Sequence, residues 1–185
     1  MTRKRSWGVA LQAAGGALAA SLLLGGTAVA RRTPFQPTVR LEAQFQMNGR
    51  VTAARHVLGE QVGQTVVRTW TFTPTCAAGP CTQVALTRQR AAGFDNLVLN
   101  LTSANLYAGT GTFYAPLRCA GRTIARGESV PFQVTVQITG TTLEGAVPVA
   151  TQVQATYADL GRRNLTRCVA APGHDAAVYN GVRVS

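Results

Sequence analysis

Apolar residues recur at every second position through most of the chain after residue 40, and this spacing restricts the fold more than any other feature. A period of two places alternate side chains on opposite faces of a β-strand, whereas a helix would repeat every three or four residues. The clearest runs lie at 41–48, 66–73, 83–87, 97–102, 132–139 and 149–158, and shorter strands are expected near 110–118, 164–168 and 177–184.

Turn residues separate these runs, as in Gly79-Pro80, Ala92-Gly93 and Thr139-Gly140. Short connections between strands predict that neighbours in the chain pair antiparallel. We therefore expect an all-β fold, an antiparallel meander of about eight or nine strands that closes into a barrel, with a two-sheet β-sandwich as the alternative. Even spacing of the strands favours the barrel, because a Greek-key arrangement needs at least one long connection between strands. The expected aromatic core is Trp70, Phe72, Phe94, Phe132 and Tyr157.

The N-terminus has the composition of a secretory signal peptide. Arg3, Lys4 and Arg5 precede an uncharged stretch at 7–29, which ends in the small residues of Ala28-Val29-Ala30. We expect cleavage after Ala30, and retention of the segment as a membrane anchor is the alternative. The predicted organisation is a signal peptide at 1–30, an extended lead-in at 31–38 and a single all-β domain at 39–185, secreted or otherwise extracytoplasmic, with no membrane span after cleavage.

Four cysteines follow the signal segment, and an even number in an oxidising compartment predicts two disulfides. Cys76 and Cys81 flank a Gly-Pro turn and can close easily. That pairing leaves Cys119 to bond with Cys168. Two further histidines, far apart in the sequence, are too few to complete a metal site with two cysteines, so neither metal nor cofactor is expected.

The mature chain is basic, since 15 of the 18 Lys and Arg residues follow Ala30, against seven acidic residues. These basic residues are scattered and form no tract. Long-range attraction would favour anionic envelope components, or another envelope protein, as partners. The alternative is a merely solvated surface, and no nucleic acid is expected as a partner.

No catalytic motif stands out. His174 and Asp175 are the most reactive pair, and they are predicted to lie in a polar loop after 171–173. Neighbouring residues of an extended segment usually point in opposite directions, so a polar turn is the preferred interpretation. The seven carboxylates lie on separate segments, and their spacing predicts no pair of the kind that glycoside hydrolysis needs.

The segment Trp70-Thr71-Phe72-Thr73-Pro74-Thr75-Cys76, with Cys81 and a later group around Asn164-Leu165-Thr166-Arg167-Cys168, resembles a pattern in small secreted bacterial proteins of unassigned activity. The resemblance extends over most of the mature chain. It rests on core aromatics and paired cysteines, so it implies a fold and a location and brings no catalytic residue with it.

Three functions are therefore considered. The first is a non-enzymatic binding or interaction module outside the cytoplasmic membrane. The second is a carrier whose barrel holds a small apolar ligand, since a barrel of about eight strands can enclose one. The third is a hydrolase that uses two carboxylates. Inward Gly or Ala residues would favour the carrier, and a core filled by the five aromatics named above would count against it.

Overall fold

The computed structural model describes residues 36–169 and 171–184, so the expected signal peptide and the first part of the lead-in lie outside the described residues. The described chain is all β. Its strands are β1 (Ala43–Arg55), β2 (Thr65–Pro74), β3 (Gln83–Gln89), β4 (Phe94–Ser103), β5 (Leu106–Cys119), β6 (Arg122–Glu144), β7 (Val147–Asp159), β8 (Arg163–Asn164) and β9 (His174–Arg183). Within these residues no helix has the length and apolar character needed to span a bilayer.

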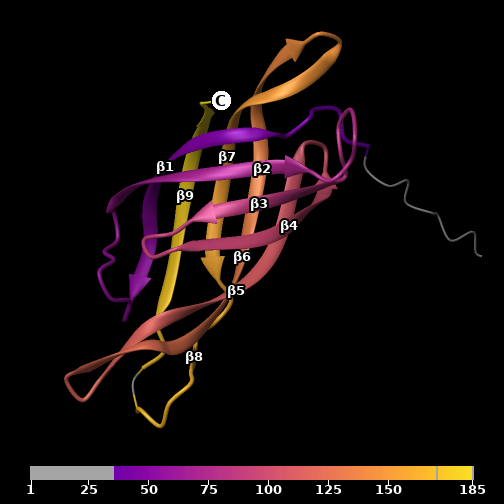
Figure 1. Ribbon diagram of the computed structural model, residues 1–185. Helices are drawn as coiled ribbons and strands as arrows, with labels where there is room; N and C mark the ends of the chain where they lie inside the picture. The colour runs from indigo at the N-terminus through magenta and orange to yellow at the C-terminus, as the bar shows by residue number, and fades with distance from the viewer. Residues whose placement is uncertain (1–35, 170, 185) are drawn as a thin grey trace, which may run out of the picture. The chain divides into compact units, whose positions relative to one another are not determined.

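Eight of the strands form a closed barrel (Figure 1). Strands β1 to β6 each pair antiparallel with the next strand in the chain, β7 pairs with β9, and β9 pairs with β1, so the ring closes. Strand β8 pairs only with β6, outside the ring. The predicted barrel-like meander is confirmed, and the sandwich alternative is not adopted by the chain.

The sequence alternation sets which side chains enter the barrel. On β2, Trp70 and Phe72 are buried while Thr73 is exposed. Four of the five aromatics expected in the core are buried, but Phe94 is 63 % exposed, so that assignment was wrong. Phe94 is out of phase with Leu97 on the same strand, and the pleat therefore turns it to the outer face.

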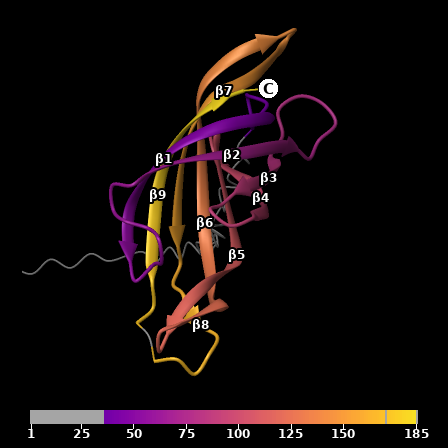
Figure 2. The same cartoon turned by 60° about the vertical axis from the view of Figure 1, so that its left-hand side comes forward.

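The barrel has two different ends, and Figure 2 shows the hairpins β5–β6 and β6–β7 extending beyond opposite ends. We call the end with the β2–β3, β4–β5 and β6–β7 turns the closed end. There the segment before β1 lies along β7, with hydrogen bonds of 2.8 Å from the Arg40 amide to the Pro148 carbonyl and 2.9 Å from the Ala150 amide to the Arg40 carbonyl. This segment buries Val39 and Leu41 in the core.

Small inward residues make room for large neighbours in this core. A methyl group at Gly49 would lie 2.3 Å from a ring carbon of Tyr179, and one at Gly111 would lie 2.6 Å from a ring carbon of Phe132. Aromatic side chains thus fill the space that the glycines leave. The inward glycines therefore do not by themselves create a cavity.

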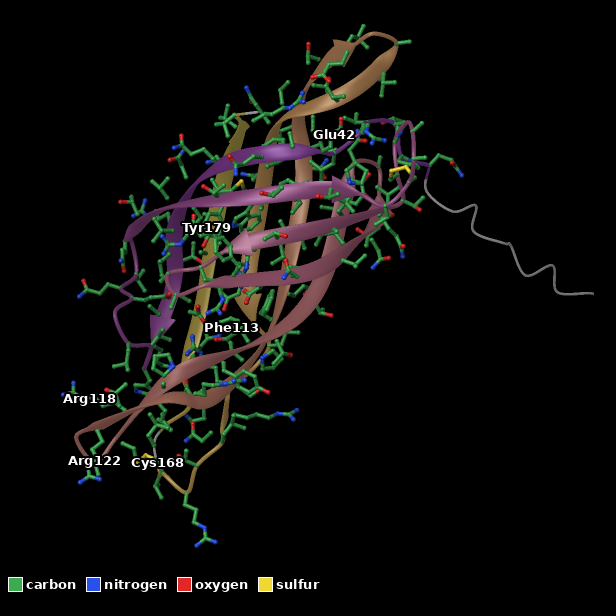
Figure 3. All side chains as sticks on the ribbon, viewed as in Figure 1. Glu42, Phe113, Arg118, Arg122, Cys168 and Tyr179 are labelled. Atoms are coloured by element: carbon green, nitrogen blue, oxygen red, sulfur yellow. A yellow bond between two sulfur atoms is a disulfide. The ribbon has the colours of Figure 1, made fainter. Side chains whose placement is uncertain are left out.

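Two disulfides are present, as predicted: Cys76–Cys81 and Cys119–Cys168. The first closes the β2–β3 turn. The second joins the tip of the β5–β6 hairpin to the connection after β8, in the region where Figure 3 labels Arg118, Arg122 and Cys168. Both are consistent with an extracytoplasmic protein.

Several predicted boundaries differ from the observed strands. The expected strand near 110–118 is a full strand of 14 residues, β5, whereas the one near 164–168 is reduced to the two residues of β8. Strand β6 is 23 residues long, because it continues through both projecting hairpins. The β6–β7 hairpin is exposed on both faces from Thr141 to Glu144, so periodicity does not reveal that part of the strand.

Candidate functional site

The other end of the barrel, which carries the β1–β2, β3–β4, β5–β6 and β7–β9 connections, contains a cavity of about 440 Å³. We call it the open end. Apolar side chains cover much of the cavity wall, contributed by the strands and by the β1–β2 loop. They include Val51, Val57, Leu58, Val66, Phe113, Ala177 and Tyr179. A cavity of this size is in the range that small-molecule sites occupy.

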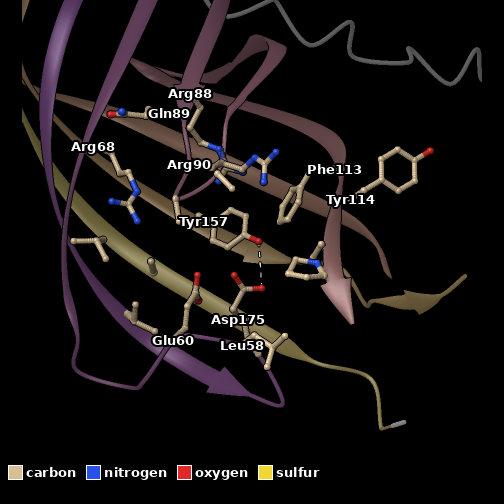
Figure 4. Close-up of a pocket in the computed structure, with 18 of the residues that line it drawn as sticks. Leu58, Glu60, Arg68, Arg88, Gln89, Arg90, Phe113, Tyr114, Tyr157 and Asp175 are labelled. Carbon is tan, nitrogen blue, oxygen red and sulfur yellow. Dashed lines mark hydrogen bonds between the residues drawn. The ribbon is translucent and has the colours of Figure 1, made fainter. Parts of the chain in front are cut away.

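Three arginines, Arg68 on β2, Arg88 on β3 and Arg90 in the β3–β4 turn, line one side of the cavity (Figure 4). We call them the arginine wall. Arg88 is 4 % exposed and donates from Nη2 to Asp95 over 2.6 Å. Arg90 donates from Nε to the other oxygen of Asp95 over 2.7 Å. One carboxylate therefore serves two guanidinium groups, and the wall keeps an excess of positive charge.

Aromatic rings hold these guanidinium groups in place. The Arg88 guanidinium carbon lies 4.3 Å from the ring centre of Phe132 and 4.5 Å from that of Tyr157. The Arg90 carbon lies 4.3 Å from the ring centre of Phe113. Cation–π contacts stabilise the charge and restrict the side chains. The arginine wall is therefore largely preorganised.

A second group of charges surrounds Arg162, which lies in the connection after β7. Its guanidinium donates to Glu128 over 2.9 Å, to Asp159 over 3.3 Å and to Asp175 over 2.6 Å. All four side chains are buried. We call them the Arg162 cluster, and of its carboxylates only Asp175 lines the cavity.

The Arg162 cluster separates the pKa values of its two aspartates. Burial raises the pKa of Asp175, and the neighbouring Asp159 raises it further, although Arg162 opposes both effects. Burial would also raise the pKa of Asp159, but hydrogen bonds from Asp175, His174 and Arg162 outweigh it, so that pKa is lowered. One carboxylate of the pair thus keeps its proton to higher pH than the other.

Glu60 lies at the cavity mouth, on the β1–β2 connection, and is half-buried. Burial raises its pKa, and repulsion by Asp175 adds to this, while Arg162, Arg68 and Arg88 lower it. Tyr157 stands between the two charged groups, with its hydroxyl 3.3 Å from Asp175. Figure 4 shows Arg68, Arg88 and Arg90 on one side of Tyr157, with Glu60 and Asp175 on the other.

The two site residues expected from the sequence, His174 and Asp175, begin strand β9 instead of lying in a loop. Their side chains take opposite faces, as expected for neighbours in extended backbone. Both nevertheless contact Asp159: His174 Nδ1 lies 2.8 Å from Oδ1, and the Asp175 amide donates to Oδ2 over 2.7 Å. Asp175 therefore belongs to the buried Arg162 cluster, and the more exposed His174 contacts that cluster through Asp159.

Sequence reasoning missed the arginine wall and the meeting of three carboxylates at Arg162. A signal for the wall was present, because Arg68 is in phase with Val66 and Trp70, and Arg88 with Leu86, on inward faces. A charged residue on the apolar face of a strand indicates either a buried ion pair or a ligand site. No comparable signal located Arg162, which lies outside the regular strands.

The fold and the cavity together define the class: a closed up-and-down β-barrel with one filled end and one hollow end. Comparison with protein-family models, with curated proteins and with solved structures finds no match in any of the three. Among residues 36–169 and 171–184, no three His, Cys, Asp or Glu side chains are placed to hold a metal ion. The chemistry of the cavity therefore carries the functional argument.

Proposed function

We propose that the chain is a secreted, non-enzymatic binding protein whose ligand is a small molecule held in the cavity at the open end of the barrel. The observation that carries this proposal is the cavity itself, about 440 Å³ in a barrel whose opposite end is packed with side chains. Apolar walls with a few convergent polar groups are typical of small-molecule sites. The basic N-terminal segment with its apolar stretch, and the two disulfides, support an extracytoplasmic location.

The proposal combines two of the functions considered from the sequence, the binding module and the carrier. It replaces the small apolar ligand expected for the carrier with an amphipathic ligand. A purely apolar ligand would desolvate Arg68, which has no acidic partner among the described residues, and this is unfavourable. An amphipathic molecule can contact the apolar walls and the charged groups at once.

Hydrolysis by two carboxylates is supported less well. Asp159 and Glu128 accept hydrogen bonds from Arg162 and are almost fully buried. A catalytic acid must reach the substrate directly or through one water molecule. Within the Arg162 cluster only the Asp175 carboxylate lines the cavity, and Arg162 already binds it. Glu60 also lines the cavity, but no hydrogen bond among the described residues joins it to Asp175 as a catalytic pair.

Native mass spectrometry of the secreted, non-reduced protein, purified without detergent, tests the proposal. We expect a population with the added mass of a small molecule, which Ala177→Leu should remove because Ala177 is buried and lines the cavity. The matched control is Ala158→Leu, on the outer face of the neighbouring strand and opposite Ala176 in the pairing. Bare protein that also takes up no added amphiphile would contradict the proposal.

A further inference from the structure

We propose that the cavity selects a small amphipathic carboxylic acid, with its carboxylate at the arginine wall and its hydrocarbon part against the apolar side chains. This inference rests on the proposed function and specifies the ligand class. Four observations carry it: a buried guanidinium with an unmatched donor, an arginine without an acidic partner, a shared counter-ion and an adjoining apolar surface.

Arg88 is the first observation. Its side chain is 96 % buried, its Nη2 is bound by Asp95, and its Nε is buried with no hydrogen-bond partner among the described residues. A buried donor without a partner is unfavourable, and a role in ligand binding is one explanation for its presence beside a cavity. The stacking of Arg88 between Phe132 and Tyr157 keeps it beside the cavity.

Arg68 is the second. Its Nη1 donates to the carbonyl of Val67 over 2.9 Å, and within the described part of the chain no carboxylate comes within ion-pair distance of it. Arg68 lines the cavity on β2, the strand that pairs with the strand of Arg88. Two neighbouring strands therefore direct one incompletely paired guanidinium each to the same space.

The charge distribution selects an anion over a cation. Arg88 and Arg90 share Asp95, and Arg68 adds a further positive charge, so the arginine wall is positive by about two charges before a ligand is bound. On the facing side, the Arg162 cluster sets three carboxylates against one guanidinium, and Glu60 adds a further negative charge to the cavity lining. The positive charge is therefore confined to the arginine wall, where an anionic head group is favoured.

A carboxylate matches the geometry of guanidinium groups, because it accepts two parallel hydrogen bonds in one plane. The apolar lining from Leu58, Val66 and Phe113 supplies the contact for hydrocarbon. A cavity of about 440 Å³ accommodates a chain on the order of ten carbons, since pockets of 300–1,000 Å³ hold small ligands. Decanoate is therefore a suitable probe.

Isothermal titration calorimetry with decanoate, 1-decanol and decylammonium tests the inference, since the three probes share one chain and differ in head group. We expect decanoate to bind about tenfold or more tightly than decanol, and decylammonium to bind most weakly. Arg68→Gln should weaken decanoate binding by about tenfold and leave decanol unchanged. Arg50→Gln, an exposed arginine on β1 outside the cavity, is the matched control.

The outcomes separate this inference from the proposed function. Equal affinity for decanoate and decanol, or decanoate binding that Arg68→Gln does not weaken, would overturn the anion selectivity while the cavity remained a binding site. No binding of any of the three probes to the native protein would overturn the proposed function itself. Binding of decanoate that both Arg68→Gln and Ala177→Leu weaken, with Arg50→Gln unchanged, supports both.

Discussion

Removal of the Cys119–Cys168 disulfide should destabilise the protein far more than removal of Cys76–Cys81. The first bridge closes a separation of 49 residues and the second a separation of 5. On a chain-entropy estimate, the long loop contributes about 4 kcal/mol and the short loop about 2 kcal/mol to the free energy of unfolding. The long bridge also ties the β5–β6 hairpin to the connection between β8 and β9.

The assay is urea unfolding at equilibrium, monitored by tryptophan fluorescence, since Trp70 is fully buried in the core. The double variants Cys119→Ser with Cys168→Ser, and Cys76→Ser with Cys81→Ser, are compared with the native protein. We expect the first pair to lose about twice the free energy of the second. The reasoning is refuted if the short bridge contributes as much as the long one, or if loss of the long bridge changes stability by less than about 1 kcal/mol.

Three further changes test the charged groups. Arg162→Met should lower the free energy of unfolding by about 3–5 kcal/mol in urea titrations, because it leaves three buried carboxylates without their cation; a loss under about 1 kcal/mol would contradict the ion-pair account. Asp175→Asn should become less destabilising as pH rises. The raised pKa of Asp175 means that the native protein loses free energy of unfolding once pH passes above the ordinary pKa of an aspartate, whereas the asparagine variant does not. Urea titrations between pH 4 and pH 8 that give a constant difference between the two proteins would contradict this. Glu60→Gln should tighten decanoate binding about two- to fivefold in calorimetry by removal of a negative charge at the mouth, and weaker binding would show that Glu60 contributes to the site.

The strands and their faces could be predicted because the barrel has one apolar face and one solvated face. Trp70 and Phe72 on β2 and Leu97 on β4 follow this rule. Phe94 was assigned to the core because it is hydrophobic, although the alternation along β4 places it on the outer face. Asp95, two residues before Leu97, is the inward residue. A strict period of two assigns both residues correctly.

The candidate site could be predicted only in part. Asp159 is in phase with Tyr157, and Asp175 with Ala177, so each was recognisable as an inward charge at the end of a strand. Their meeting depends on the pairing of β7 with β9, which the intervening loop does not reveal. Arg162 lies in that loop, where no periodicity exists. The alternation along each strand thus identifies inward charged residues, whereas the pairing of strands in the closed barrel determines which of these residues come into contact.

The central claim, that the ligand lies inside the open end of the barrel, is tested most directly by methyl NMR of the isotope-labelled protein during titration with decanoate. Adjacent residues provide internal controls: Val66 and Ala177 line the cavity, whereas Val67 and Val178 are exposed on the outer face. We predict saturable shifts at Val66 and Ala177, with Val67 and Val178 almost unchanged. Shifts confined to the outer-face methyls, or none at Val66 and Ala177, would contradict the account.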